Sequence, residues 1–215
     1  MKIDDEMFEE IFHDEEEQIE TIELKKSPVK STVFDWAGCL FVALVWVLIL
    51  MTFVFRVVDV DGTSMEPTLI NTDKVVITDL FYTPHDGDIV VISHGEEYEK
   101  PLVKRVIATE GQSLKIDFEK NEIYVDGVLL QENYTQGLTN IGDIPESEYP
   151  SVIPEGKIFV LGDHRDVSLD SRYYKVGLID ENDIIGKAQL VVIPHTYASG
   201  ALMPTLDLTK IRYLY

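Results

Sequence analysis

The stretch GTSMEPTL, residues 62–69, places Ser64 between two small residues and Met-Glu-Pro, shortly after a long apolar segment. A serine hydroxyl in such a setting could attack a carbonyl carbon. A hydroxyl alone is a poor nucleophile, however, and it needs a neighbouring base to take its proton. The rest of the chain must therefore supply that base, or the stretch is only a turn.

Histidine is the usual partner of a catalytic serine, and the chain has five histidines. His13 lies before the apolar segment, on the other side of the predicted membrane helix from Ser64. His85 and His94 lie in polar turns, and His195 lies near a strand end. His164 alone lies in a dense polar motif. The nucleophile-elbow pattern Gly-x-Ser-x-Gly also fails, because Glu66 stands where its second glycine would be. A Ser-His-Asp hydrolase is therefore poorly supported.

Lysine is the alternative base, because burial disfavours the ammonium and lowers the pKa of the amine toward neutrality. The stretch PLVKRVIA places Lys104 among apolar residues. In an extended strand Lys104 would share a face with Leu102 and Val106, while Arg105 would face the other way. Lys104 is thus the candidate buried amine. Taken alone, it could also be a surface lysine whose stem covers apolar surface.

A third motif, GDHRDVSLDSR at residues 162–172, follows the apolar run KIFVL. It gathers three aspartates, two arginines, two serines and one histidine into eleven residues. By itself it could be a hydrogen-bonded loop or a cation site. No cluster of Cys and His has the spacing of zinc ligands, and the single cysteine, Cys39, cannot form a disulfide within the chain. We expect neither a metal nor a cofactor.

The composition restricts the partners. The 215 residues include 39 acidic and 18 basic ones, giving a net charge of -21, which argues against a nucleic-acid partner because phosphate contacts need a basic surface. We expect residues 1–33 to form an acidic, mostly disordered cytoplasmic tail. Apolar residues recur in it at helical spacing, so a docking segment for a partner remains open.

Residues 36–55, WAGCLFVALVWVLILMTFVF, carry no charge over 20 positions, about the length of helix that crosses a bilayer. The run is longer than the apolar part of a secretory signal peptide, and no convincing small-x-small cleavage site follows it. We therefore predict one retained transmembrane helix over residues 34–56. Lysines precede it and only Arg56 follows it closely, which places the N-terminus in the cytoplasm and residues 57–215 outside.

Residues 57–215 are predicted to form a mainly β domain. Short runs rich in Val and Ile alternate with turn residues; these runs are KVVITDL, DIVVIS, SLKIDF, EIYVDGVLL, KIFVLGD and AQLVVIP. EIYVDGVLL predicts a hairpin with Asp126-Gly127 in a type I′ turn. Residues 134–154 are polar and contain Gly and Pro, which indicates a surface loop.

Together these motifs resemble the type I signal peptidases, the bacterial leader peptidases, which are membrane-bound Ser-Lys proteases that remove signal peptides. Ser-Met-x-Pro-Thr-Leu from Ser64 is similar to the nucleophile box, and Gly-Asp-Ile-Val-Val from Gly87 to a family strand. Lys-Arg-Val-Ile from Lys104 is similar to the lysine box, and residues 162–172 to the last box. The resemblance covers about residues 35–196, and the short single-pass form is similar to Gram-positive members.

The resemblance implies a coiled antiparallel β-sheet catalytic domain of the signal-peptidase type, preceded by one transmembrane helix. Ser64 would be the nucleophile, and Lys104 would be the general base that later protonates the leaving amine. Ser168 would hydrogen-bond the lysine nitrogen. Asp170 and Arg172 would form a supporting ion pair that shapes the loop. The Ser64 N–H would help to stabilise the oxyanion.

The resemblance also implies where a substrate binds. A peptide would add as a strand between residues 58–62 and the strand that carries Lys104, over shallow apolar pockets that accept small side chains. The residues implied in substrate binding are Val60, Gly62, Met65, Leu69, Leu102 and Val103. The substrates would be precursor proteins that bear signal peptides, met at the lipid bilayer in which the chain is anchored.

Three positions depart from the family pattern. Gly62 brings no hydroxyl to the oxyanion, where some members have a serine; His164 replaces the commoner asparagine; and residues 108–111, ATEG, replace a Gly-x-Pro-Gly turn. None of these changes removes a catalytic group. Two alternatives remain: a catalytically inactive homologue that serves as a membrane-anchored assembly scaffold, and a self-cleaving repressor. The repressor would need a soluble DNA-binding domain in place of the tail and anchor.

Overall fold

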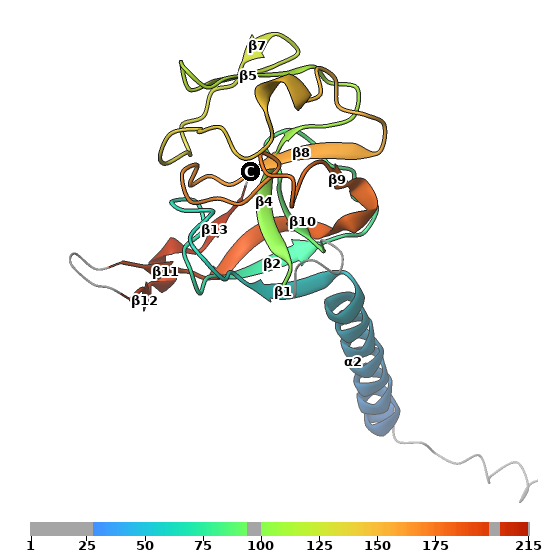
Figure 1. Cartoon of the computed structure of the whole chain (residues 1–215). Coiled ribbons are helices and arrows are strands. Elements are labelled where there is room, and N and C mark those ends of the chain that lie inside the picture. Colours follow the sequence, from blue (N-terminus) through green and yellow to red (C-terminus); the bar gives the residue numbers. More distant parts are fainter. Residues whose placement is uncertain (1–27, 94–99, 198–202, 215) are drawn as a thin grey trace, which may run out of the picture. The chain divides into compact units, whose positions relative to one another are not determined.

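A computed structural model describes residues 28–93, 100–197 and 203–214. The chain divides into two compact units, residues 1–49 and residues 50–215 (Figure 1). The predicted acidic tail, residues 1–33, lies outside the described residues except for its end from Pro28, which is helical.

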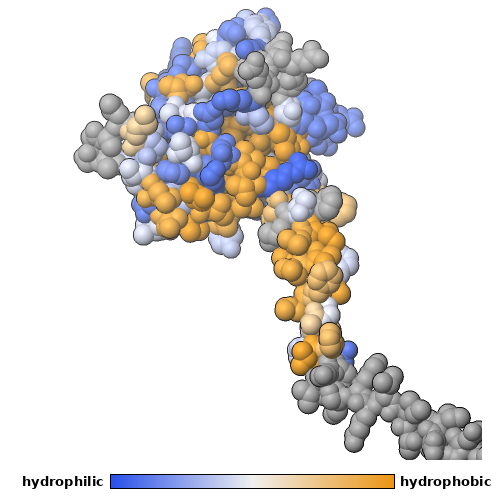
Figure 2. Space-filling model, turned by 90° about the horizontal axis from the view of Figure 1, so that it is seen from below, coloured by the Kyte–Doolittle hydropathy of each residue, from blue (hydrophilic) through white to orange (hydrophobic). Residues whose placement is uncertain are grey.

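The helix α2 (Pro28–Phe53) has 26 residues. All side chains of residues 33–50 are exposed, and Figure 2 shows apolar side chains along the visible face of the helix. It is the one helix among the described residues that is long and apolar enough to cross a membrane. The predicted end at residue 56 is corrected, because Phe55 and Arg56 already belong to strand β1. The aromatic and β-branched residues of β1 (Phe55, Val57 and Val58) suit a strand, and β1 pairs in register with β2.

The second unit is mainly β, as predicted. Its main sheet has eight strands in the order β1-β2-β10-β3-β4-β8-β9, with β13 paired to β10, and all its pairs are antiparallel. The strands are β1 (Phe55–Asp59), β2 (Lys74–Thr78), β3 (Ile89–Ile92), β4 (Leu102–Ala108), β8 (Lys157–Leu161), β9 (Ile179–Asp180), β10 (Ile184–Ile193) and β13 (Arg212–Tyr213). Register shifts in β10 and between β4 and β8 increase the local bend and twist, so that the sheet curls.

Two smaller sheets complete the unit. One has the order β5-β6-β7, and the other pairs β11 with β12. Their strands are β5 (Leu114–Asp117), β6 (Glu122–Val125), β7 (Val128–Leu129), β11 (His195–Thr196) and β12 (Thr205–Leu206), and the short 3-10 helices are η1 (Glu146–Glu148), η2 (Glu181–Asp183) and η3 (Leu208–Lys210). The predicted β6–β7 hairpin is confirmed. Asp126 and Gly127 both have positive φ, 51° and 74°, as a type I′ turn requires.

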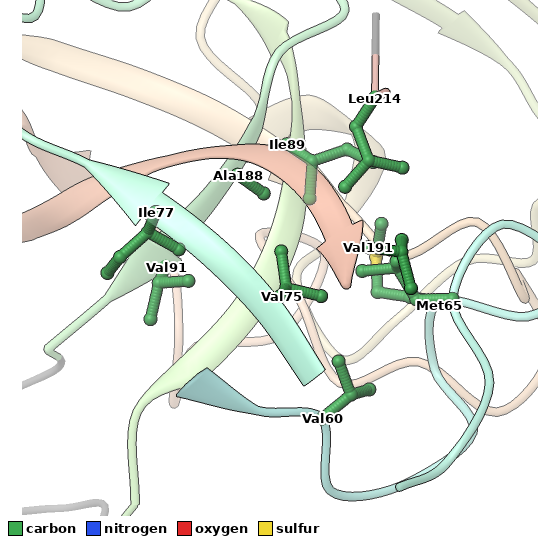
Figure 3. Close-up of a cluster of buried hydrophobic side chains, with 10 residues drawn as sticks. Val60, Met65, Val75, Ile77, Ile89, Val91, Ala188, Val191 and Leu214 are labelled. Carbon is green, nitrogen blue, oxygen red and sulfur yellow. The ribbon is translucent and has the colours of Figure 1, made fainter. Parts of the chain in front are cut away.

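The buried side chains form three clusters. The cluster that bears on the candidate site packs residues of β2, β3 and β10 against Met65, Leu69 and the C-terminal Leu214. Figure 3 shows Met65 in the same cluster as Val75 and Val191. The turn that follows Ser64 is therefore fastened to the sheet by its own apolar side chains. A second cluster lies around β5, β6 and β8, and a third joins β3, β4 and β8.

Candidate active site

Ser64 lies at the start of a tight turn. The Glu66 N–H donates to the Thr63 carbonyl oxygen at 3.1 Å, and the Leu69 N–H donates to the Met65 carbonyl oxygen at 2.9 Å. Met65 and Leu69 are 1% and 0% exposed, whereas Ser64 is half-buried. The alternation of polar and apolar side chains in this stretch thus anchors the turn from beneath and leaves the serine at its surface.

Lys104 comes from the middle of β4, where it lies opposite Val90 of β3. The residue is only 3% exposed, so the predicted burial of the amine is confirmed. Its Nζ is 2.9 Å from Ser64 Oγ and 3.0 Å from the Val103 carbonyl oxygen. The fold therefore brings the serine and the lysine into hydrogen-bond contact, although 40 residues separate them in the sequence.

Burial lowers the pKa of Lys104 from 10.5 to about 8. Loss of water around the ammonium is the largest cause, and the neighbouring Arg172 guanidinium acts in the same direction. The carboxylates of Asp170 and Asp163 oppose it by raising the pKa of the amine. A substantial neutral fraction at mildly alkaline pH follows, and a neutral amine can accept the proton of a serine hydroxyl.

The loop of residues 162–172 is held by a buried ion pair. Arg172 Nε lies 2.8 Å from Asp170 Oδ1, Arg172 Nη2 lies 2.9 Å from Asp170 Oδ2, and both side chains are fully buried. The Asp170 carboxylate also accepts the Gly162 N–H at 3.0 Å. The contact expected between Asp170 and Arg172 is thus present, and it ties the two ends of the loop together.

Ser168 does not make the hydrogen bond to Lys104 that the resemblance implies. Its Oγ is buried and has no hydrogen-bond partner among the residues that the structure describes. Ser168 Oγ and the Ser64 carbonyl oxygen both crowd the point where a Cβ at Gly162 would stand. The hydroxyl therefore lies beside the Ser64 backbone, while the lysine nitrogen bonds to Ser64 and to the Val103 carbonyl oxygen.

The six residues implied in substrate binding divide into two groups. Val60, Met65 and Leu69 are core residues with at most 5% exposure, whereas Leu102 and Val103 are half-buried and Gly62 is exposed. Gly62 has a φ of +102°, a conformation that strains any residue with a side chain. Its N–H donates to Asn71 Oδ1 at 3.0 Å, and the space where a side chain would stand is open.

A buried ion pair that the sequence reasoning missed joins three parts of the site. Arg105 Nε and Nη2 contact the two oxygens of Asp163 at 2.8 and 2.6 Å, and the residues are 4% and 0% exposed. Thr68 Oγ1 donates to the same carboxylate at 2.5 Å, and the guanidinium lies over the ring of Tyr134. The sequence did hold one signal for this pair: side chains alternate along β4, so Arg105 faces away from Lys104, among apolar residues on the other side of the strand.

The C-terminal segment also contacts the nucleophile turn. Arg212 of β13 donates to the carbonyl oxygen of Thr68, and the Tyr197 hydroxyl lies 3.3 Å from Glu66 Oε1. Leu214 packs into the same cluster as Met65. No motif in the sequence pointed to these contacts, because the last residues lie outside the resemblance.

The ring nitrogens of His164 do not contact Ser64 Oγ. Nδ1 lies 3.3 Å from the Thr63 carbonyl oxygen, and Nε2 lies 3.5 Å from Asp166 Oδ1. The geometry therefore provides a Ser-Lys pair and gives no support to a Ser-His-Asp triad. Among the described residues, no group of three or more His, Cys, Asp or Glu side chains could hold a metal ion.

The model of one protein family, described as "Signal peptidase, peptidase S26", matches residues 33–193. The chain belongs to this family. The match begins in α2 and ends at the last residue of β10, so it includes Ser64, Lys104 and the loop of residues 162–172. The signal peptidase resemblance, and with it the prediction of a serine endopeptidase, are confirmed.

Curated signal peptidases cover most of the chain. A "Signal peptidase I P" of Bacillus subtilis subsp. natto is 34% identical over 79% of this chain and 94% of its own length. A "Signal peptidase IB" of Staphylococcus aureus is 33% identical over 74% of this chain and 88% of its own. A crystal structure described as a signal peptidase I from Enterococcus faecalis is 26% identical, with a TM-score of 0.40, and covers 49% of this chain and 97% of its own.

Proposed function

We propose that this chain is a membrane-anchored serine endopeptidase that removes N-terminal signal peptides from exported precursors and cleaves after small-x-small residues. The observation that carries the proposal is the 2.9 Å contact between Ser64 Oγ and the buried Nζ of Lys104, in a chain of the signal peptidase family. An inactive scaffold would not need this contact, and nothing else in the site favours that alternative.

In the proposed mechanism, neutral Lys104 takes the proton of Ser64 as Oγ attacks the carbonyl carbon of the scissile bond. The Ser64 N–H stabilises the oxyanion of the tetrahedral intermediate. The lysine ammonium then gives its proton to the leaving amine, and an acyl-enzyme remains on Ser64. Lys104 next takes a proton from a water molecule, whose oxygen attacks the acyl carbon. The ester bond to Ser64 then breaks, the lysine ammonium returns its proton to Ser64 Oγ, and the signal peptide leaves with a new carboxyl group.

The substrate is proposed to bind as an added strand between residues 58–62 and the start of β4. Gly62 offers the open surface that a peptide backbone needs for close approach. Leu102 and Val103 are accessible at the edge, while Val60, Met65 and Leu69 form the floor beneath. A shallow floor of this kind favours small side chains at the cleavage site. Asp170 and Arg172 support the site by holding its loop, and Ser168 lies buried beside the Ser64 backbone.

We propose that α2 spans the bilayer once, with the N-terminus in the cytoplasm and residues 57–215 outside. The charge-free sequence of 36–55 and the lysines before it support this topology. Tethering suits the reaction, because the substrate also arrives as a membrane-inserted apolar segment, and confinement to one surface raises the effective concentration. The acidic residues before α2 remain a candidate docking segment for a cytoplasmic partner.

Purified full-length chain in detergent micelles is expected to cleave a secretory precursor with alanine at both small positions of its cleavage site. A matched precursor with phenylalanine directly before the scissile bond should be cut at least about 10²-fold more slowly, because the floor cannot accept a ring. Mass spectrometry of the new N-terminus gives the cleavage position. Cleavage by the Ser64→Ala variant at the wild-type rate would overturn the proposed function.

The rate is expected to depend on pH through Lys104. Only the neutral amine can take the serine proton, so kcat/KM should rise about tenfold per pH unit on the acidic side and level off above the pKa of about 8. A series of initial rates from pH 6 to 9.5 on the alanine precursor measures this profile. A rate that stays flat from pH 8 down to pH 6 would contradict an amine base.

A further inference from the structure

The backbone that carries His164, beside the nucleophile, is held in place by buried neighbours and hydrogen bonds. Its neighbours Asp163 and Arg165 are 0% and 1% exposed. The Gln136 N–H donates to the Asp163 carbonyl oxygen at 2.8 Å, and the Arg165 N–H donates to the Gln136 carbonyl oxygen at 2.7 Å. The position from which the imidazole projects is therefore fixed on both sides.

Two groups of His164 contact the backbone around Ser64. The His164 N–H donates to the Ser64 carbonyl oxygen at 3.0 Å, and the ring Nδ1 lies 3.3 Å from the Thr63 carbonyl oxygen. A carbonyl oxygen only accepts, so this contact is a hydrogen bond when Nδ1 carries the proton. His164 thus binds the oxygens of both peptide units that flank the nucleophile.

The Thr63 carbonyl belongs to the same planar peptide unit as the Ser64 N–H. In a trans peptide the C=O and the N–H point in opposite directions, so a carbonyl held on one side aims the N–H to the other. The Thr63 oxygen accepts two bonds, from Glu66 N–H at 3.1 Å and from His164. Among the described residues, no acceptor takes the Ser64 N–H, which leaves it free to donate to a substrate.

We propose that His164 is a positioning residue that holds the Thr63–Ser64 peptide so that the Ser64 N–H points at the developing oxyanion. This inference rests on the proposed function. A donor of this kind accelerates the reaction only if it is oriented before the charge forms. Gly62 brings no hydroxyl to the oxyanion, so the backbone donor carries more of the stabilisation here. The imidazole acts through the peptide and exchanges no proton with the substrate.

The charged group that faces the imidazole is Asp166. Its Oδ1 lies 3.5 Å from Nε2, on the side of the ring away from Thr63, and the aspartate side chain is 54% exposed. A carboxylate only accepts, so this contact is a hydrogen bond when Nε2 carries a proton, and in the neutral ring with its proton on Nδ1 it is not one. The neutral tautomer with its proton on Nδ1 is sufficient for the proposed role, so the role persists at the alkaline pH where Lys104 is neutral.

Two substitutions of similar size separate the hydrogen bond from packing. In His164→Asn the amide nitrogen can stand where Nδ1 stands and donate to the Thr63 carbonyl, whereas His164→Leu fills the same space without a donor. With the alanine precursor and full-length chain in micelles, we expect His164→Leu to lower kcat about 10- to 100-fold, since complete loss of an oxyanion donor costs about 10²- to 10³-fold. KM should stay within about threefold, and His164→Asn should keep kcat within about threefold of wild type.

Hydrogen exchange of the peptide that contains residues 62–66 provides a second readout that does not need turnover. Exchange should be faster in His164→Leu than in wild type, and unchanged in His164→Asn, at equal melting temperatures. Equal kcat in His164→Leu and wild type, or an equal loss in both variants, would overturn the inference. If wild type cleaves no precursor, the proposed function fails, and the exchange measurement still decides whether His164 orders the turn.

Discussion

The substitution Lys104→Met is expected to abolish cleavage and at the same time to stabilise the folded chain. Removal of the amine leaves Ser64 without a base, so kcat on the alanine precursor should fall at least about 10³-fold. Methionine has a similar length and no charge, so it can occupy the buried site without desolvating an ammonium. A substitution at a purely structural position would rarely abolish activity and increase stability together. The two results together therefore identify a buried catalytic amine.

The size of the stabilisation follows from the pKa. The amine binds a proton less tightly in the folded chain, with a pKa of about 8, than in the unfolded chain, where the pKa is 10.5. Burial of the ammonium therefore costs folding free energy. This cost grows as the pH falls from 10.5 to 8 and is complete below 8, where it amounts to about 3 kcal/mol. Lys104→Met should raise the free energy of unfolding by about 1–3 kcal/mol at pH 7, and by less at pH 10.

Urea unfolding of the full chain in micelles, followed by circular dichroism, measures this difference. The control is Lys115→Met, because Lys115 lies on β5 with an exposed side chain, and this variant should keep both activity and stability. A Lys104→Met variant that is inactive and also less stable than wild type at pH 7 would show that the ammonium is well solvated or paired in the folded state, contrary to the burial of Nζ.

Much of the fold was predictable because its strands are local patterns. Runs of Val and Ile bounded by turn residues gave the main strands, and Asp126-Gly127 required positive φ at both positions. Strand β1 was not predicted, because its aromatic and β-branched residues are also compatible with the end of an apolar helix. Only the pairing of Phe55–Asp59 with β2, a contact made in the tertiary structure, decides between the two.

The residues of the site also divide into those that a local pattern predicts and those whose contacts depend on the tertiary structure. Ser64 and Lys104 could be predicted because a nucleophile needs a base and one lysine had apolar neighbours. The Ser168 hydroxyl was expected on the lysine nitrogen and lies elsewhere, since its place depends on how closely Gly162 lets the loop approach the Ser64 backbone. The contact of Arg212 with the nucleophile turn joins residues 144 apart, and no local pattern encodes it.

The substitution Asp163→Asn is expected to destabilise the chain by about 3–5 kcal/mol, because it leaves the Arg105 guanidinium buried without its counter-charge. Both side chains are at most 4% exposed, and both oxygens of Asp163 contact the guanidinium. Asp61→Asn is the control, since Asp61 pairs with Lys100 at the surface, where removal of an ion pair should change the free energy of unfolding little. An equal, small effect of both substitutions would contradict a buried pair.

The double substitution Arg105→Met and Asp163→Leu separates stability from geometry. Replacing a whole buried pair by apolar residues can be neutral or stabilising, so the double variant should recover most of the free energy of unfolding that Asp163→Asn loses. It still lacks the carboxylate that joins Thr68 of the nucleophile turn to β4, the strand of Lys104. Because a displacement of about 1 Å can cost up to about 10²-fold in rate, we expect a folded enzyme with kcat at least about tenfold below wild type. Recovery of stability and full kcat together would mean that the pair serves folding alone and that Met65 and Leu69 suffice to place Ser64 against Lys104.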